Sequence, residues 1–518
     1  MTGAVDPSQL TATTPPRSRR SGSRTPGVGA GRVLRPGPRG WLGRGRGEAV
    51  LVTPAEEYRG TTVQVCGLWP WVVGSGTPMV GVPFGRHITS GATLCCDPIS
   101  WFQRAKLISN PSVFVLGLPG LGKSTAIRRM ATGLAGYGVM PLVLGDLRPD
   151  YVDLVTALGG QVIRLGGGRG HLNVLDPGEA TAAAGRLTGD AKAAVLADGH
   201  ARRLTVVASL ITILRNSPPT DREETILDRA LHVLDDRHDG IPVLGDLLAV
   251  IRQAPPDLRQ VALDRGDENR YRDITENLEA SLIGLTSGTG RLGDTFSRQT
   301  TNPMRRDRPV VFDVSSIDDA QTDLQAAALL ACWSAGFGMV NVANSLADAG
   351  LEPRRHYFVI MDELWRALRA GRGMVDRVDA LTRLNRRHGV GTAMISHTMS
   401  DLLALPSGED QMKARGFVER SGMVICAGLP GAEMPALTSA VPLSQAEQAM
   451  LIGWQDPPAW DAHTGHDAVP PGRGKFLVKV GGRPGIPVEV HLTAAEQTVS
   501  DTNRRWHDDP AVVGLQEG

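Results

Sequence analysis

Residues 117–124 have the types and spacing of a phosphate-binding loop. They read Gly-Leu-Pro-Gly-Leu-Gly-Lys-Ser and match the pattern G-x-x-x-x-G-K-[ST] at every required position. Glycines let the backbone fold around phosphates, and the amides of a helix N-terminus point at the anion. We expect Lys123 to reach the β- and γ-phosphates of ATP and Ser124 to ligate Mg²⁺. The predicted nucleotide contacts are Gly117, Leu118, Pro119, Gly120, Leu121, Gly122, Lys123, Ser124 and Thr125.

A second candidate, the pair Asp362-Glu363, follows the apolar run 358–361. A strand there would deliver Asp362 to the edge of a sheet, where it could hold Mg²⁺ through water. Glu363 would then polarise the attacking water as general base. Asp313, at the end of another apolar run, is the competing candidate, and it ranks second because no Glu follows it.

Two further groups are candidates for sensing or stabilising the γ-phosphate. His397, with Ser396 beside it, follows the apolar run after Asp362, where a polar residue could contact that phosphate. A solvent-facing loop histidine is the alternative interpretation. Arginines on the helix before that run could reach the phosphate of a neighbouring subunit, or could simply form a basic solvated face; these are Arg383, Arg386 and Arg387.

The segments around these residues alternate between apolar, β-prone runs and helical periodicity. Strands are expected at 112–116, 140–146, 161–165, 309–314, 357–362, 391–396 and 423–426, with helices between them. Such alternation predicts an α/β fold whose central sheet is mainly parallel and covered by helices. Runs 475–480 and 486–491, joined through glycines, predict a terminal hairpin.

The same patterns suggest a division of the chain. An Arg-, Gly- and Pro-rich tail over 1–47 is expected to be disordered, and 48–108 reads as a small β-rich lead-in. The predicted ATPase core comprises 109–177 and 291–495, interrupted by a mostly helical insertion at 178–290, and 496–518 is a C-terminal tail. Thr220 and Glu223 carry a capping-box signature within that insertion.

Composition limits the partners and the compartment. The 55 Lys and Arg nearly balance the 54 Asp and Glu, so the net charge of the chain does not favour binding to nucleic acid or to a membrane. The basic tail could tether the chain to DNA or anionic lipid, or could be merely solvated. Five scattered cysteines without C-x-x-C indicate free thiols in a reducing compartment. Residues 324–346 are long enough to span a bilayer, but their weak hydrophobicity favours a buried helix.

Four segments together resemble a known family. They are the phosphate-binding loop with Pro119, the stretch 145–151 followed by 158–160, the turn 172–177, and 361–363. These look like the conjugal-transfer ATPases of type IV secretion systems, the TraC-like or fourth VirB component, within the FtsK–HerA group of P-loop NTPases. The similarity is greatest to versions from high-GC Gram-positive bacteria. At the position of His397 this family commonly has Gln.

The resemblance implies a RecA-like core that binds ATP and Mg²⁺ and assembles as a homo-oligomer, expected to be a hexamer. The family acts at the cytoplasmic face of the membrane with channel proteins, and possibly with DNA. Two alternatives remain open at this point: an FtsK-like or coupling-protein DNA translocase, and a nucleotide-binding scaffold with little hydrolysis. Glu363 disfavours the scaffold, because a pure binding module needs no general base.

Overall fold

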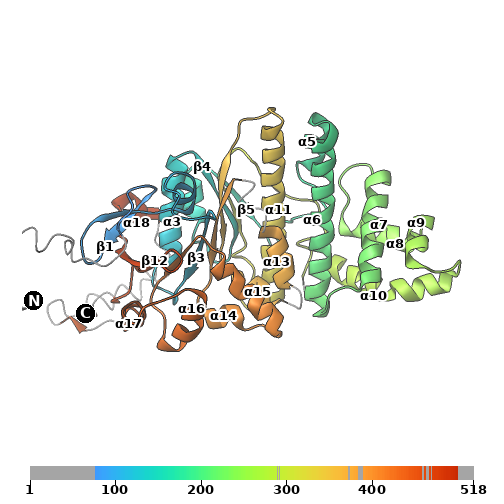
Figure 1. Ribbon diagram of the computed structural model, residues 1–518. Coiled ribbons are helices and arrows are strands. Elements are labelled where there is room, and N and C mark those ends of the chain that lie inside the picture. Colours follow the sequence, from blue (N-terminus) through green and yellow to red (C-terminus); the bar gives the residue numbers. More distant parts are fainter. Residues whose placement is uncertain are drawn as a thin grey trace, which may run out of the picture. The chain divides into compact units, whose positions relative to one another are not determined.

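An eleven-stranded sheet forms the centre of the computed structural model (Figure 1). The structure describes residues 76–288, 290, 292–370, 374–382, 389–457, 460–461, 466–467 and 470–499. The predicted tail 1–47, the first part of the lead-in and residues 500–518 therefore lie outside the described residues.

The strands of this sheet have the order β2-β1-β13-β12-β9-β3-β8-β7-β4-β6-β5. From β9 to β5 all neighbours are parallel, whereas β12, β13, β1 and β2 continue the sheet as antiparallel strands. The predicted α/β fold with a central, mainly parallel sheet is thus confirmed. The strands are β1 (Pro83–His87), β2 (Thr93–Cys95), β3 (Ser112–Leu116), β4 (Val139–Asp146), β5 (Gln161–Arg164), β6 (Val310–Asp313), β7 (His356–Met361), β8 (Val390–Ile395), β9 (Met423–Cys426), β12 (Lys475–Lys479) and β13 (Ile486–Glu489); β10 (Trp460–Asp461) and β11 (His466–Asp467) pair separately.

Helices cover both faces of the sheet, and further helices extend beyond one face (Figure 1). They are α2 (Pro98–Gln103), α3 (Lys123–Gly136), α4 (Val152–Ala157), α5 (Ala180–Arg186), α6 (Gly189–Arg215), α7 (Asp221–Arg237), α8 (Leu244–Gln253), α9 (Pro256–Ala262), α10 (Glu268–Thr286), α11 (Thr322–Asp348), α12 (Leu364–Arg369), α13 (Met374–Thr382), α14 (Met399–Leu403), α15 (Gly408–Glu419), α16 (Met434–Ala440), α17 (Gln445–Gly453) and α18 (Ala494–Val499), with a 3₁₀ turn η1 at Gly431–Glu433.

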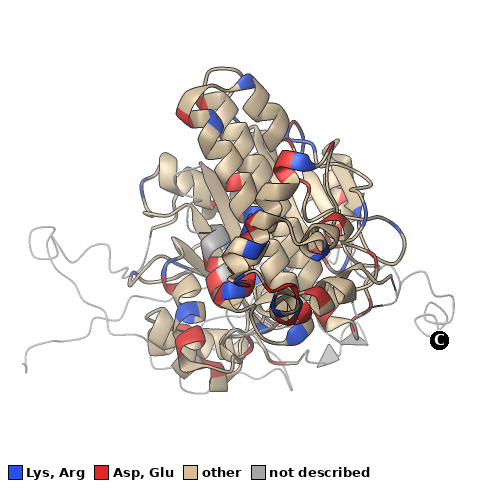
Figure 2. Ribbon diagram, turned by 90° about the vertical axis from the view of Figure 1, so that its right-hand side faces the viewer, with Lys and Arg blue, Asp and Glu red and all other residues tan. Residues whose placement is uncertain are grey.

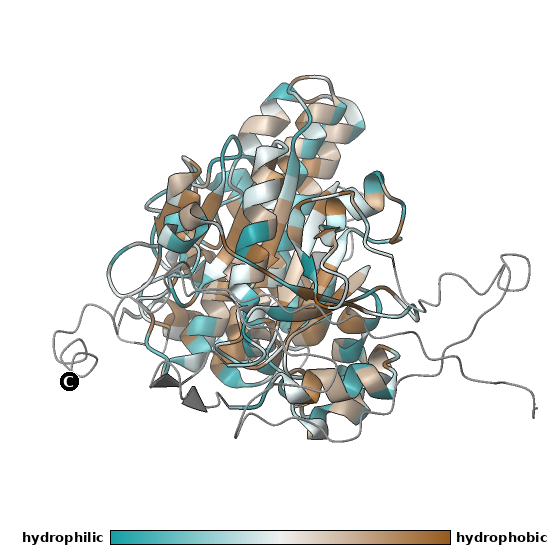
Figure 3. Cartoon of the chain, turned by 90° about the vertical axis from the view of Figure 1, so that its left-hand side faces the viewer, coloured by the Kyte–Doolittle hydropathy of each residue, from teal (hydrophilic) through white to brown (hydrophobic). Residues whose placement is uncertain are grey.

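Alternation along the strands divides the apolar side chains between two cores. On β3, Val113 and Val115 join the core that contains the apolar face of α3. Phe114 and Leu116 join the other core, with α11 and the insertion helices. Successive side chains of a strand point to opposite faces, so a fully apolar strand requires cover on both sides. Figure 3 shows hydrophobic segments gathered along the strands at the centre of the fold.

Helix α11 is the one helix of the described residues that is long and apolar enough to cross a membrane. It lies between the sheet and α6 (Figure 1), and 83% of its most apolar window is buried inside the protein. At Gly336 a side chain would collide with Leu144 of β4 at 2.4 Å, so the helix packs very closely on the sheet. This helix is buried, as the sequence analysis expected, and its burial explains its apolar composition.

The insertion forms a helical layer outside α11. The predicted capping box at the start of α7 is present, because Glu223 N donates to Thr220 Oγ1 at 3.3 Å and Thr220 N donates to Glu223 Oε2 at 2.8 Å. Helix α9, which the sequence analysis did not anticipate, is a short segment that begins at Pro256. Figure 2 shows Lys and Arg interspersed with Asp and Glu along the helices that face the viewer.

A buried ion pair connects α17 to the terminal hairpin. Lys479, only 2% exposed, donates to Glu447 Oε1 at 3.0 Å and to the carbonyl of Arg483 at 2.7 Å. Glu447 Oε1 also accepts from Gly485 N at 2.6 Å. The carboxylate therefore holds three parts of the chain together.

We expect Glu447→Ala to lower the free energy of unfolding by about 3–5 kcal/mol, because it leaves the Lys479 ammonium buried without its counter-ion. Burial favours a raised pKa for Glu447, but the amides of Ser444 and Gly485 and the Lys479 ammonium lower it overall. The stability that Glu447 contributes is therefore present above pH 4.5, the ordinary pKa of a glutamate, and it is lost as the pH falls below that value. Urea unfolding at pH 7 and pH 4 measures both effects, with the exposed Glu409→Ala as control.

Candidate nucleotide-binding site

The site is built at the carboxyl edge of the parallel strands. β3 ends at Leu116 directly before the loop, β7 ends at Met361 before Asp362, and β8 ends at Ile395 before Ser396. Parallel pairing places these three ends on one edge, with Val115 opposite Ile395 and Met361 opposite Met394. Ligands of open α/β sheets bind at this edge.

The backbone of the loop has the conformation that its glycines allow. Gly120 and Gly122 have φ values of 80° and 95°, which disfavour residues with a Cβ. At Gly117 a Cβ would lie 2.5 Å from the Cβ of Ala427, so this position also requires glycine for space. Helix α3 begins at Lys123 without a side-chain cap, which leaves its first amides available to an anion.

Lys123 is buried beneath this loop. Its Nζ donates to the carbonyls of Gly117 and Leu118 at 2.6 and 3.1 Å and lies 3.2 Å from Nδ1 of His397. Burial lowers the pKa of Lys123, and the nearby carboxylates of Asp362 and Glu363 oppose that shift. In this geometry the ammonium is directed at protein acceptors, and phosphate oxygens would have to replace some of them.

Asp362 and Glu363 lie beside Lys123 but differ in their surroundings. Burial and the adjacent Glu363 carboxylate raise the pKa of Asp362 to about 7. Burial would likewise raise the pKa of Glu363, but hydrogen bonds from His397 and Trp365 lower it overall. Glu363 also has a left-handed backbone, with φ 51° and ψ 40°, although it is not glycine. Such conformations cost about 1–3 kcal/mol and persist where the surrounding structure imposes them.

His397 lies between Lys123 and Glu363. Its Nε2 is 3.3 Å from Glu363 Oε1, and its Nδ1 faces the Lys123 ammonium. Because an ammonium can only donate, Nδ1 accepts and Nε2 carries the proton that faces the carboxylate. The structure therefore brings together Lys123, Glu363 and His397 from three separate segments. The solvent-facing alternative for His397 is not what the structure shows, since its ring contacts both charged groups.

A further acidic pair faces the same region and received no role from the sequence. Asp146, at the end of β4, accepts from the amides of Asp150 and Tyr151 at 3.1 and 2.8 Å. Asp150 contacts the hydroxyl of Ser124, although burial raises the pKa of its carboxyl. The segment 145–151 had been noted only as part of a family-like pattern. Its position beside Ser124 depends on strand order, which no local pattern reveals.

Trp365 is another residue of the site that sequence reasoning missed. Its Nε1 donates to Glu363 Oε2 at 2.5 Å, and its ring lies 6.3 Å from that of His397. The guanidinium groups of Arg366 and Arg369 lie 5.0 and 4.7 Å from the centre of the indole. Glu363 is thus held from two sides, by an indole and an imidazole. Proximity to Glu363 in the chain was the only available signal.

Strand order separates the two candidates for the acidic role. Asp362 follows β7, two strands from β3, whereas Asp313 ends β6, four strands from β3. At about 4.8 Å per strand, Asp313 is roughly 10 Å more distant from the loop. Its carboxylate instead accepts from the amide and hydroxyl of Ser315 at 3.1 and 2.6 Å. Strand order therefore places Asp362 nearer to the loop than Asp313, and the role of Asp362 stays a prediction.

The arginines proposed to act on a neighbouring subunit, Arg383, Arg386 and Arg387, lie outside the described residues, and their role stays a prediction.

The turn before β12 contacts the phosphate-binding loop directly. Gly474 N donates to the carbonyl of Leu121 at 3.1 Å. The terminal hairpin thereby closes against the nucleotide-binding loop.

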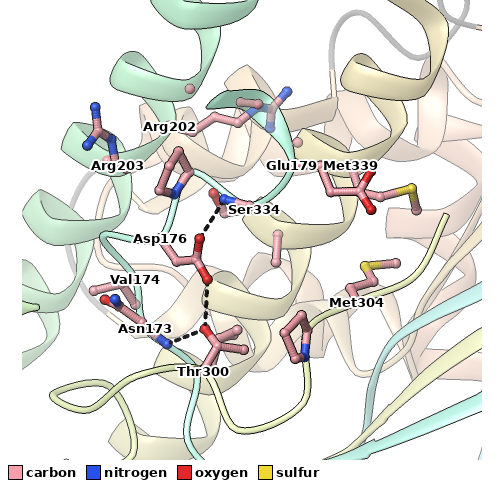
Figure 4. Close-up of a pocket in the computed structure, with 18 of the residues that line it drawn as sticks. Asn173, Val174, Asp176, Glu179, Arg202, Arg203, Thr300, Met304, Ser334 and Met339 are labelled. Atoms are coloured by element: carbon pink, nitrogen blue, oxygen red, sulfur yellow. Dashed lines mark hydrogen bonds between the residues drawn. The ribbon is translucent and has the colours of Figure 1, made fainter. Parts of the chain in front are cut away.

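A cavity of about 260 Å³ lies elsewhere, between α6, α11 and the turn 172–180. Figure 4 shows Asp176 directed toward Thr300, whose hydroxyl donates to it at 3.1 Å. Arg202 and Arg203 of α6 line the same cavity, together with acidic and apolar groups. No residue of the loop or of Asp362-Glu363 lines it, so this cavity is separate from the predicted nucleotide site.

The sheet order, the loop and the acidic strand end define the fold of a RecA-like P-loop NTPase. Among solved structures, VirB4 of Thermoanaerobacter pseudethanolicus matches with a TM-score of 0.59 and 18% identity, over 82% of this chain and 100% of that one. The conjugative coupling protein TrwB matches with a TM-score of 0.47 and 12% identity, over 74% of this chain and 86% of that one. No protein-family model and no curated protein matches the sequence. The likeness to VirB4 shows a shared fold.

Proposed function

We propose that the protein is a Mg²⁺-dependent ATPase that energises conjugative DNA transfer or type IV secretion. The observation that carries this proposal is the arrangement of Lys123, His397 and Glu363 at the end of the loop, within a fold that matches all of the VirB4 chain. A scaffold would need the loop but not a carboxylate held by His397 and Trp365.

In this proposal each group has a distinct role. The loop amides and Lys123 bind the phosphates of ATP and stabilise the negative charge that develops on them. Glu363 accepts a proton from the attacking water, and the contacts from His397 and Trp365 fix its carboxylate in position. His397 contacts both Lys123 and Glu363, so it is placed to link phosphate binding to the general base.

The residues present fit a bound Mg²⁺ ion. The carboxylates of Asp150, Asp362 and Glu363 all act on the charge of Lys123, and Asp362 resists ionisation because of burial and Glu363. A cation would relieve this excess of negative charge. Ser124 and Asp362 would hold Mg²⁺, which when bound neutralises charge on the phosphates. Oxygen ligands of this kind are the ones that Mg²⁺ prefers.

The broader context is part of the same proposal. We place the protein at the cytoplasmic face of the membrane, as a homo-oligomer, expected to be a hexamer, working with channel proteins of a secretion system. TrwB has been solved with ADP and Mg²⁺ and with an ATP analogue. In such an oligomer Arg386 or Arg387 would contact the nucleotide of the neighbouring subunit.

Steady-state ATP turnover, measured with and without single- and double-stranded DNA while light scattering follows assembly, tests this function. Turnover that does not respond to DNA supports a secretion motor driven by protein partners. Strong stimulation by DNA would favour a translocase instead. Absence of turnover in every condition, with intact nucleotide binding, would favour a scaffold.

Because both ring nitrogens of His397 make contacts, we expect two substitutions of this residue to lower kcat to different extents. We expect His397→Ala to lower kcat by about 10–150-fold, the range given by losing a hydrogen bond to a charged group worth roughly 1.5–3 kcal/mol. His397→Gln should retain several-fold more activity, because its amide oxygen can accept from Lys123 while its NH₂ donates to Glu363. Equal kcat values for the two variants would contradict the bridging role.

A further inference from the structure

A cluster of metal-ligating side chains lies in the helical insertion, outside the nucleotide site. His200 of α6 and Asp228 and His232 of α7 each offer one ligand atom, and these atoms lie within 4.8 Å of one another. The two helices run side by side in Figure 1. Asp228 and His232 are four residues apart, so they share one face of α7.

The two rings and the carboxylate lie close together. Nε2 of His200 lies 2.8 Å from Asp228 Oδ1, and the rings of His200 and His232 stack with centroids 4.0 Å apart. In a tetrahedral site with bonds of 2.0–2.1 Å, the ligand atoms are roughly 3.4 Å from each other. The three ligand atoms lie within 4.8 Å of one another, so metal binding requires the side chains to rotate toward that spacing.

The carboxylate of Asp235 faces the other nitrogen of His200, at a distance too long for a hydrogen bond. Nδ1 of His200 is 3.8 Å from Asp235 Oδ2, and no hydrogen-bond partner is present for this buried nitrogen among the described residues. Asp235 is itself held by two hydrogen bonds of 2.6 Å from Arg203. A carboxylate behind a histidine is the usual support of a metal-bound imidazole, since it fixes the ring and raises its basicity.

We propose that His200, Asp228 and His232 form a binding site for a divalent transition-metal ion such as Zn²⁺. Zinc is bound in proteins by two imidazoles and one carboxylate, and a fourth position remains for water. The ion would fasten α7, and the outer helices packed on it, to α6, which contacts the core helix α11. This role is independent of the ATPase proposal.

Protons compete with the metal at this site. The carboxylates of Asp228 and Asp235 lie 2.8 and 3.8 Å from the two nitrogens of the His200 ring. His232 stacks on the same ring. Because an imidazolium must lose one of its two ring protons before it can bind a metal, we expect metal affinity to fall as the pH is lowered, with protons released on binding.

The test uses the full chain without nucleotide or Mg²⁺, titrated with Zn²⁺ by calorimetry and with Co²⁺ by visible absorption. The wild type should bind one equivalent with a tetrahedral Co²⁺ spectrum, and its Tm should rise with Zn²⁺ concentration. His232→Ala and Asp228→Asn should weaken binding at least as much as the about 10–100-fold caused by loss of an outer-sphere partner.

The matched control is His238→Ala. His238 faces a single carboxylate, with Nε2 3.3 Å from Asp246 Oδ2, and it lies at the end of the same helix α7. This variant keeps every cysteine and should bind as the wild type does. Unchanged binding in His232→Ala, a loss in His238→Ala equal to that in His232→Ala, or no binding by the folded wild type would overturn the proposal.

Discussion

Glu363→Gln should lower the kcat of ATP hydrolysis by about 10²–10⁴-fold, the contribution of a positioned general base. The amide keeps the size of the side chain and can still accept from Trp365, so the local packing should persist. Nucleotide affinity should change little, because Glu363 faces His397 and Trp365 and not the amides of the loop. Single-turnover hydrolysis and fluorescent-nucleotide binding measure the two quantities separately.

Glu409→Gln provides the matched control for this variant. Glu409 is an exposed carboxylate that pairs only with Lys413 on the surface of α15 among the described contacts, so its kcat should equal that of the wild type. Turnover by Glu363→Gln at the wild-type rate would remove Glu363 from the mechanism and leave Asp150 or Asp362 to be tested as the base.

Lys123→Ala should abolish productive ATP binding and lower turnover by at least about 10²–10³-fold, the loss typical of removing one preorganised donor from a developing charge. The ammonium is buried and already directed along the loop by the carbonyls of Gly117 and Leu118. No other lysine of the described site can replace it. Isothermal titration with ATP and Mg²⁺, followed by steady-state assays, measures the effect.

The control for Lys123→Ala must separate lost chemistry from lost folding. Lys413→Ala removes an exposed lysine whose ion pairs are with Asp376 and Glu409, and it should leave both binding and turnover unchanged. Lys123→Ala should keep a cooperative thermal transition, since the removed ammonium carries a desolvation cost of its own. Undiminished ATP binding in a folded Lys123→Ala protein would contradict the assigned role.

The sequence predicted most of the core because its signals are local. Apolar runs flanked by turn residues predicted the strands, and helical periodicity predicted the helices between them and the mostly helical insertion. The loop 117–124 could be recognised outright, since its glycines are required by positive φ values and close contacts within a few residues. The edge strands β1 and β2 were harder, because β1 pairs with β13, some 400 residues further along the chain, and β2 joins the sheet only through β1.

The candidate site was only partly predictable, because local signals do not reveal contacts between distant segments of the chain. Lys123 and the pair Asp362-Glu363 were identified from motifs, and parallel strands necessarily bring their ends to one edge. Asp150 and Trp365 were missed, because their proximity to Ser124 and Glu363 depends on how β4 and α12 leave the sheet. The arginines near residue 386 remain a prediction that the described residues do not test.

What the sequence determined by itself was the phosphate-binding loop, the alternation of strand and helix, and the presence of an acidic strand end. These depend on backbone conformation and burial within short stretches of chain. The tertiary structure alone decided that β7 and not β6 lies near β3, that His397 bridges Lys123 and Glu363, and that His200 meets His232. Each of these is a contact between distant segments, set by strand order and helix packing that no local periodicity encodes.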